Sequence, residues 1–433
     1  MNHPFSITIH RGTQQIGGSC VELRYGNTRL IVDAGTELPG IDDSGERSDE
    51  MPPLLNVPGL FTDDGTVVKA VLLSHNHGDH SGLLPYIRQG VPVCMSKGTS
   101  QMLMISGMFL PQRIRQKKRG EPEQIPALNG ETISLGDFRV TPFTVDHSGY
   151  DARAFIIEGG GKRIIYSGDL RMHGPQRASM EQMLEHPLWQ NPDALIMEGT
   201  HLGKPQSGVE TEESFVARLT NDLQSTSGLA LLMFSPQNVE RLRTMIAAAK
   251  AADRIFVTDP YTLYVLYCVW RDARMPNPFS RSGNIRVWFP NGRSRDLRRS
   301  FLKNLIPKID AIALTPDDIV QDSARYSMVF RESMTRASEQ LLKRATVAIH
   351  SLWQGYEQTK KTGDLKKHFE ACGVPWLYRH SSGHIHHVDL LAFVRSVQPK
   401  NLIPIHTETG DRFAEFLPEI KVKRLADGEE LVL

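Results

Sequence analysis

Residues 74–80 of this sequence read Ser-His-Asn-His-Gly-Asp-His and directly follow the apolar run 67–73 (VVKAVLL). In an extended chain, side chains two positions apart point the same way, so the first two histidines can meet at one point. The glycine then allows a turn that brings the last aspartate and histidine to a second point nearby. Imidazole and carboxylate groups bind Zn²⁺ or Mn²⁺, and two such ions ~3.5–4 Å apart can share a bridging water. A polar loop rich in histidine by chance is the alternative, but this density of ligands favours a centre for two metal ions.

Acids and histidines also close several strand-like runs elsewhere in the chain. Taken alone, each is more often a turn former than a ligand. Because strand ends meet at the edge of a sheet, where loops carry functional sites, we expect these side chains to gather at one edge. They are Asp33 at the end of TRLIVD (28–33), His147 after the run 138–145, Asp169 at the end of RIIYSGD (163–169), Glu198 at the end of ALIME (194–198) and His406 at the end of NLIPIH (401–406).

The pattern of apolar runs and turn residues changes twice along the chain. Up to about residue 204, short β-branched runs are broken by Gly, Pro, Asn and Asp, which predicts strands buried on both sides or packed in a sandwich. From 205 to 375, helical and strand-like stretches alternate, which predicts an α/β unit of its own. The pattern of the first region, short strand-like runs broken by turn residues, returns over 376–433. The sequence therefore predicts one domain, residues 1–204 and 376–433, interrupted by a second over 205–375.

Composition excludes several classes of protein. The 433 residues carry 50 Lys and Arg against 49 Asp and Glu, a net charge of +1, which argues against a uniformly basic nucleic-acid coat protein but leaves local basic patches open. The four cysteines form no CxxC pair, so neither a disulfide scaffold nor a cysteine zinc site is expected. No apolar run reaches the ~20 residues that span a bilayer, and the N-terminus lacks the features of a leader. We expect a cytoplasmic protein that does not contact a membrane.

The HxHxDH pattern with downstream histidine and aspartate resembles the metallo-β-lactamase fold hydrolases, which have an αββα sandwich. The resemblance implies two metal ions, zinc first and manganese as the alternative. It also implies that Asp33 holds a ligand histidine in place without touching a metal. Carried over residue by residue, the ligands are His75, His77 and His147 for one metal, Asp79, His80 and His406 for the other, and Asp169 as the bridge.

The region around the predicted insertion narrows the resemblance. Glu198-Gly199-Thr200, the segment ending in Gly383-His384, and Pro404-Ile405-His406 are similar to motifs A, B and C of the β-CASP subgroup of nucleic-acid-processing enzymes. A histidine at motif C resembles the RNA-cleaving branch, to which ribonuclease J belongs. The resemblance implies a metal-dependent ribonuclease, acting as an exonuclease, an endonuclease or both, with single-stranded RNA as its partner.

Phosphodiester hydrolysis needs an attacking hydroxide, neutralisation of the phosphate oxygens and an acid for the leaving oxygen. Two metals provide the first two, with a bridging hydroxide as nucleophile and Asp79 as a catalytic carboxylate that also binds metal. His384 is the candidate general acid, beside the Ser382 and Gly383 amides that could hold a phosphate oxygen. Glu198 would orient and charge His384, with a helix N-cap as the alternative role.

Three short basic runs, 113–119, 293–303 and 360–367, are candidate contacts to RNA phosphates, although such runs are usually solvated faces. We expect the run 293–303 to bind phosphates and to make binding salt-dependent. Trp353 and Tyr356 could stack a base, but the expectation is that they lie in the core. The predicted phosphate-binding side chains are Arg293, Arg295, Arg298 and Arg299.

Two departures from ribonuclease J limit what the resemblance implies. Its Gly-Ser-Gln-Gly-Glu-type loop is replaced by 350–355 (HSLWQG), so sensing of a 5′ phosphate is not carried over. The sequence ends soon after His406, so we expect no dimer through the C-terminal domain of bacterial ribonuclease J, while another homo-oligomer stays open. A small-molecule ester or lactone hydrolase, a DNA-directed nuclease and a catalytically silent RNA-binding scaffold are the alternative functions.

Overall fold

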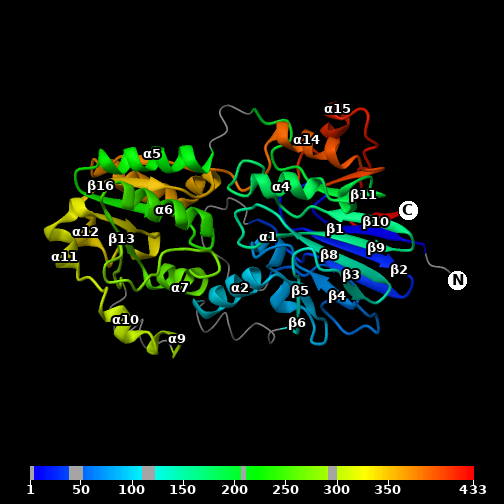
Figure 1. The fold of residues 1–433 in the computed structure, drawn as a ribbon, viewed down its shortest axis with the longest axis horizontal. Coiled ribbons are helices and arrows are strands. Elements are labelled where there is room, and N and C mark those ends of the chain that lie inside the picture. Colours follow the sequence, from blue (N-terminus) through cyan, green and yellow to red (C-terminus); the bar gives the residue numbers. More distant parts are fainter. Residues whose placement is uncertain (1–3, 39–51, 110–121, 206–210, 291–299) are drawn as a thin grey trace. The chain divides into compact units, whose positions relative to one another are not determined.

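The computed structural model describes residues 4–38, 52–109, 122–205, 211–290 and 300–433 (Figure 1). The chain forms two compact units. The first comprises Met1–Pro39, Ser48–Val209 and Gly383–Leu433, and the second includes Glu210–Ser382. The predicted domain boundaries at 204 and 375 stay a proposal. The predicted phosphate-binding residues Arg293, Arg295, Arg298 and Arg299 lie outside the described residues, as does the basic run 113–119.

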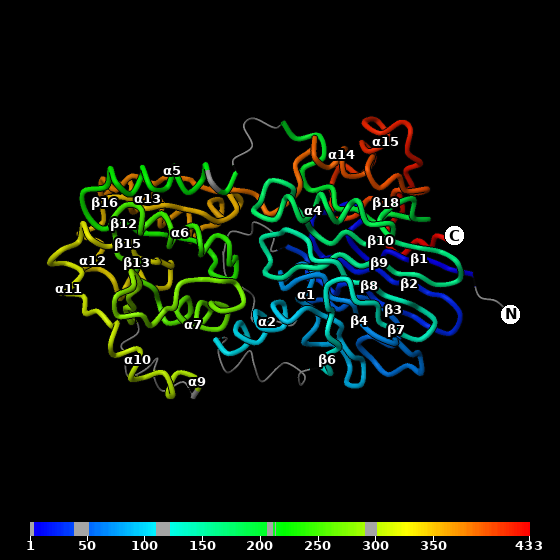
Figure 2. Tube along the Cα trace, in the orientation of Figure 1, coloured from blue at the N-terminus to red at the C-terminus, as the bar shows by residue number. Residues whose placement is uncertain are grey.

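The first unit contains two mixed sheets. The order of the first is β19 (Glu430–Val432), β1 (Ser6–Arg11), β2 (Cys20–Tyr25), β3 (Thr28–Val32), β4 (Ala70–Leu72), β5 (Val93–Met95) and β6 (Gln124–Pro126). The order of the second is β18 (Leu402–Ile405), β11 (Ala194–Glu198), β10 (Lys162–Tyr166), β9 (Arg153–Gly159), β8 (Phe138–Thr144) and β7 (Ile133–Leu135). The chain trace in Figure 2 shows the C-terminal elements returning to the sheets built from the N-terminal half.

The two sheets pack face to face. Alternate residues of the first sheet, such as Ile7 and Leu30, share one buried cluster with Phe155 and Ile164 of the second. A strand places every second side chain on the same face, so the residues between them point outward and bury a second layer. The outer face of the second sheet packs against α4 (Arg177–Leu184) and α14 (His387–Val397), and that of the first packs against residues 83–87. This layering confirms the predicted αββα sandwich.

The second unit is built on a parallel sheet. Its order is β14 (Ile285–Val287), β13 (Ile255–Thr258), β15 (Tyr326–Val329), β12 (Leu229–Met233), β16 (Ala345–His350) and β17 (Trp376–Tyr378). Parallel strands covered on both faces read as continuous apolar runs, and β12 (LALLM) is buried at every position. The long helices are α5 (Glu212–Gln224), α6 (Val239–Ala251), α7 (Pro260–Val269) and α13 (Lys360–Ala371). This unit confirms the α/β class expected for the insertion.

Polar side chains cap the N-termini of three long helices of the second unit. Thr211, Asn238 and Asp259 each accept a backbone N–H of the first turn of α5, α6 and α7, which satisfies a donor that would otherwise have no partner. Other helical segments are α1 (Gly78–Ser81), η1 (Leu84–Tyr86), α2 (Lys97–Phe109), η2 (Pro187–Trp189), α9 (Ser300–Lys303), α10 (Ile306–Asp310), α11 (Pro316–Gln321), η3 (Ser323–Arg325), η4 (Glu332–Met334), α12 (Glu339–Leu342), η5 (Gln354–Gln358), η6 (Gly410–Arg412) and α15 (Phe413–Phe416).

The expectation that Trp353 and Tyr356 lie in the core is wrong. Their exposed fractions are 53% and 41%. Both follow the carboxyl end of β16, where the chain leaves the sheet and forms η5 on the surface. Apolar character predicts burial only where the residue lies on the face of a strand or helix that packs against another layer. The segment around η5 has no such face.

None of the helices in the described ranges is long and apolar enough to cross a membrane.

Candidate metal centre

Strand ends of the first unit deliver the candidate residues to one edge. In the second sheet β8, β10, β11 and β18 run in the same direction, and β3 and β4 are parallel in the first sheet. Asp33 and His406 have positive φ angles, +57° and +55°, so the chain turns sharply as it leaves β3 and β18. Both residues therefore end their strands, and their side chains lie at the edge of the sheet.

Three histidine side chains form the first group. The Nε2 atom of His75 lies 3.0 Å from Nδ1 of His77, and Nε2 of His147 lies 3.1 Å from the same atom. Nitrogen atoms that converge in this way surround a point that a cation can occupy, as the predicted ligand set requires.

A second group consists of Asp79, His80, Asp169 and His406, whose ligand atoms lie within 4.8 Å of one another. Oδ2 of Asp169 is 3.1 Å from Nε2 of His80 and 3.7 Å from Nε2 of His406. The same oxygen is 3.8 Å from Nε2 of His75 in the first group. One carboxylate therefore faces both groups, which is the position of a bridging ligand.

Outer contacts orient these imidazoles through their other nitrogen. Asp33 is fully buried, lies 2.7 Å from Nδ1 of His80, and also accepts hydrogen bonds from Ser74 and Tyr166. The Gly383 carbonyl accepts from Nδ1 of His147 at 2.6 Å. Such partners select the tautomer that leaves the facing nitrogen able to bind a metal.

Burial and neighbouring charges prepare the ligands electrostatically. Burial holds the pKa of His75 and of His147 well below the ordinary value, so both are neutral and carry a lone pair. Burial also opposes ionisation of Asp169, but His406 and His80 outweigh it and keep the pKa of this carboxyl well below its usual range. Asp169 Oδ1 is buried without a hydrogen-bond partner among the described residues. The neutral nitrogens of His75 and His147 and the ionised carboxylate of Asp169 fit a divalent cation.

A histidine–glutamate pair lies beside the second group. Nδ1 of His384 is 3.0 Å from Oε2 of Glu198, whose Oε1 accepts the Leu170 amide. Burial lowers the pKa of His384, but Glu198 and Asp169 outweigh it and raise the pKa to about 9. Glu198 is buried, and because Thr211 caps the following helix α5, the alternative of a helix cap at Glu198 is not observed.

Two known families match this chain. Residues 28–214 match the beta-lactamase superfamily domain, and residues 378–417 match the Zn-dependent metallo-hydrolase RNA specificity domain. Ribonuclease J of Mycobacterium tuberculosis H37Rv is 24% identical over 430 residues, which cover 92% of this chain and 68% of that protein. The chain is similar to the metallo-β-lactamase fold family, and within it to the ribonuclease J-like β-CASP branch. The RNA specificity match contains His384 and His406, and the other contains His75 to Glu198.

Three further proteins are similar to this chain. The transcription termination factor FttA of Methanothermobacter thermautotrophicus is 24% identical over 313 residues, 67% of this chain and 45% of that protein. An RNase J-like protein of Methanocaldococcus jannaschii is 23% identical over 63% of each chain. A crystal structure of a protein of unknown function from Enterococcus faecalis V583 superposes with a TM-score of 0.80 at 22% identity and full coverage of both chains, which supports the fold alone. The chain spans less than half the length of the FttA relative.

The metallo-β-lactamase family and the His/Asp cluster make a divalent metal the cofactor of this chain. All seven predicted ligands lie together, and Glu198 and His384 lie beside them. Ser382 is the last residue of the second unit and is half-buried. Gly383 contributes its carbonyl to His147, and a Cβ at this position would collide with Ser148. Phosphate binding by Ser382 and Gly383 stays a prediction.

Several residues of the candidate centre were not expected from the sequence. The Tyr166 hydroxyl donates to Asp33 at 2.7 Å, and Oγ1 of Thr200 lies 2.9 Å from Nδ1 of His406. Asp146 accepts from Nε of Arg171 at 2.7 Å, and both side chains are about 1% exposed. These two flank predicted ligands, since Asp146 precedes His147 and Arg171 follows Asp169 by two positions. That proximity was the available signal.

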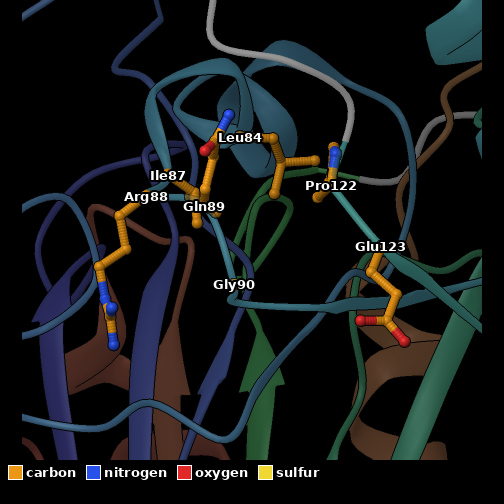
Figure 3. Close-up of a pocket in the computed structure, with 7 residues that line it drawn as sticks. All are labelled: Leu84, Ile87, Arg88, Gln89, Gly90, Pro122 and Glu123. Carbon is orange, nitrogen blue, oxygen red and sulfur yellow. The ribbon is translucent and has the colours of Figure 1, made fainter.

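A separate hollow of about 180 Å³ lies elsewhere in the first unit (Figure 3). None of the predicted metal ligands lines it. The lining residues are Leu84, Ile87, Arg88, Gln89, Gly90, Pro122 and Glu123.

Proposed function

We propose that this chain is a metal-dependent ribonuclease that hydrolyses phosphodiester bonds of single-stranded RNA with two metal ions, zinc being the proposed metal. The observation that carries the proposal is one buried carboxylate, Asp169, facing two groups of ligands, with His384 and Glu198 alongside. The relatives named ribonuclease J and the match to an RNA specificity domain support RNA as the substrate class.

The ligand assignment follows the two groups. His75, His77 and His147 would hold one ion, Asp79, His80 and His406 the other, and Asp169 would bridge them. When bound, the two ions supply a hydroxide nucleophile at neutral pH and neutralise the phosphate oxygens.

His384 is proposed as the general acid. Its Nδ1 pairs with Glu198, so Nε2 is the atom that would donate a proton to the leaving oxygen. Burial lowers the pKa of this imidazole, but the Glu198 carboxylate outweighs it, which favours the protonated form that a general acid needs. Glu198 would set the orientation and charge of the ring without touching the substrate.

Labelled RNA and DNA oligonucleotides of one sequence, incubated with the protein loaded with Zn²⁺ or Mn²⁺, test the proposal. We expect cleavage of single-stranded RNA, weaker cleavage of DNA and no turnover of a generic lactone. Turnover of the lactone without cleavage of either oligonucleotide would assign the centre to a small-molecule hydrolase. A 5′-labelled substrate read by product length also separates exonucleolytic from endonucleolytic cleavage.

A further inference from the structure

Exposed aromatic side chains are confined to one place in the described part of the chain. Among the Trp, Tyr and Phe residues of that part, only Trp353 and Tyr356 are exposed. A large aromatic ring left in water forgoes the free energy that burial provides. Two such rings, three residues apart, are typical of a surface that is covered by a ligand.

The rings are held in a defined arrangement. Their centroids are 5.7 Å apart and their planes meet at 83°, an edge-to-face pair. The Trp353 ring lies against the bare backbone of Gly355, where a Cβ would collide with it. The pair is therefore pre-organised, which lowers the entropy lost when a flat ligand stacks on it.

Polar contacts at Glu357 anchor the segment that carries the rings. Glu357 accepts from Nε1 of Trp376 at 2.9 Å and from Nζ of Lys366 at 3.1 Å. Its carboxylate also lies 3.3 Å from Nδ1 of His350, which is buried at the end of β16. The sheet and α13 thus fix η5 without help from Trp353 and Tyr356, whose exposed faces are not needed to hold the fold.

Positive charges follow directly. The helix α13 begins with Lys360 and Lys361 and also carries Lys366 and Lys367, and three of the four are exposed. These four lysines outnumber the two exposed acids of the helix, Asp364 and Glu370. Exposed aromatic rings followed in the sequence by exposed lysines match the chemistry of single-stranded nucleic acid, whose bases stack while its phosphates pair with cations.

We propose that Trp353 and Tyr356, with Lys360 and Lys367 of α13, form an aromatic platform that binds single-stranded RNA by stacking its bases. The proposal rests on the proposed ribonuclease function and adds a binding site in the second unit to the metal centre of the first.

Binding of a nuclease-resistant 2′-O-methyl oligonucleotide to the metal-loaded protein, measured by fluorescence anisotropy, tests the platform. We expect Trp353→Ala to raise the Kd about 10-fold, the scale for loss of one stacked base, and Trp353→Phe to stay within about 3-fold. Leu128→Ala, which removes an exposed apolar side chain of the first unit, is the matched control and should leave Kd unchanged. Turnover of bis(p-nitrophenyl) phosphate should be equal in all four proteins, because this small ester does not need the platform.

Two further measurements separate stacking from other causes. An oligonucleotide with abasic sites throughout should bind wild type weakly and Trp353→Ala equally weakly. The double variant Lys360→Ala/Lys367→Ala should reduce the slope of log Kd against log salt by about 1.4, since each phosphate contact on a single strand contributes ~0.7.

The proposal fails if Trp353→Ala binds the base-containing oligonucleotide as tightly as wild type, or if the penalty persists on the abasic strand. A change in oligomeric state of Trp353→Ala by light scattering, at unchanged RNA affinity, would assign the rings to a protein interface and overturn it as well. Wild type that neither cleaves nor binds RNA would instead sink the ribonuclease function itself, so the two failures are distinguishable.

Discussion

The two units place polar side chains at the carboxyl ends of their strands in the same way, but the side chains meet different partners. In the first unit, like groups converge: Nε2 of His75 lies 3.0 Å from Nδ1 of His77, and Asp169 faces two groups of ligands. In the second, opposite charges pair: Arg331 donates to Asp259 at 2.7 Å and to Thr262 at 3.0 Å.

This difference distinguishes a cluster that can bind a cation from an ion pair that only stabilises the fold. Buried polar groups are costly unless they are paired, so a mutually neutralised pair needs nothing more. The converging nitrogens of His75, His77 and His147 carry no opposite charge, and Asp169 Oδ1 is buried without a hydrogen-bond partner among the described residues, so these atoms mark where a cation belongs. The same strand-end position therefore supports a metal centre in one unit and an ion pair in the other.

Removal of one ligand should have the largest effect. We expect Asp79→Asn to lose most of its bound metal and to reduce RNA hydrolysis to background, because the second ligand group loses a charged oxygen and the nucleophile depends on the metals. Elemental analysis and a cleavage assay measure both. Full metal content with full activity would refute the assignment of Asp79 as a ligand.

Replacement of the proposed general acid, His384, should lower the rate of cleavage without changing the metal content. His384→Ala is expected to keep wild-type metal content and to lower the chemical rate by ~10²-fold or more, the usual scale for a general acid. Single-turnover kinetics on labelled RNA, with elemental analysis of the same sample, test this. If metal is lost together with rate, His384 is a ligand, which the cluster of Asp169, Glu198, His384 and His406 would allow.

Replacement of Asp33, which contacts the proposed ligand His80 but is not itself a proposed ligand, should have an intermediate effect on metal affinity. Asp33→Ala leaves Nδ1 of His80 without its carboxylate, and we expect metal affinity to fall about 10- to 100-fold. Tyr166→Phe removes a single donor to the same carboxylate and should cost less. Competition with a chelator gives both affinities, and unchanged values would show that Asp33 does not orient its ligand.

The corresponding change in the second unit should leave the metals untouched. Asp259→Asn breaks the pair with Arg331, which is partly exposed, so we expect a loss of unfolding free energy of about 1–3 kcal/mol with wild-type metal content. Burial opposes ionisation of Asp259, but Arg331 outweighs it and lowers the pKa, so this stabilisation is present above the ordinary carboxyl pKa and is lost as the pH falls through the lower folded value. Thermal unfolding of wild type and variant between pH 3 and pH 7 should show curves that converge at the acidic end; loss of metal in Asp259→Asn would contradict the contrast.

Much of the first unit was predictable because its signals are local. The strand runs at TRLIV, RIIY and ALIME have the composition of buried strands, and each ends in or is followed within three positions by an acidic residue, so the αββα sandwich and a cluster at its edge could be expected. The role of Tyr166 could not, because its hydroxyl reaches Asp33 across 133 positions of sequence. Burial of Trp353 was expected from its apolar character. That expectation was wrong because the position of η5 on the surface depends on the tertiary structure.

The sequence by itself determined the chemistry: the imidazoles and carboxylates, their places at strand ends, and the family they indicate. Only the tertiary structure decided which atoms face one another, because the packing of two sheets brings His80, Asp169 and His406 within 4.8 Å across hundreds of residues. It also decided which strand-end groups neutralise each other, as Asp259 and Arg331 do, and which aromatic rings stay in water. These outcomes depend on distances between elements far apart in the chain, and local propensity carries no information about them.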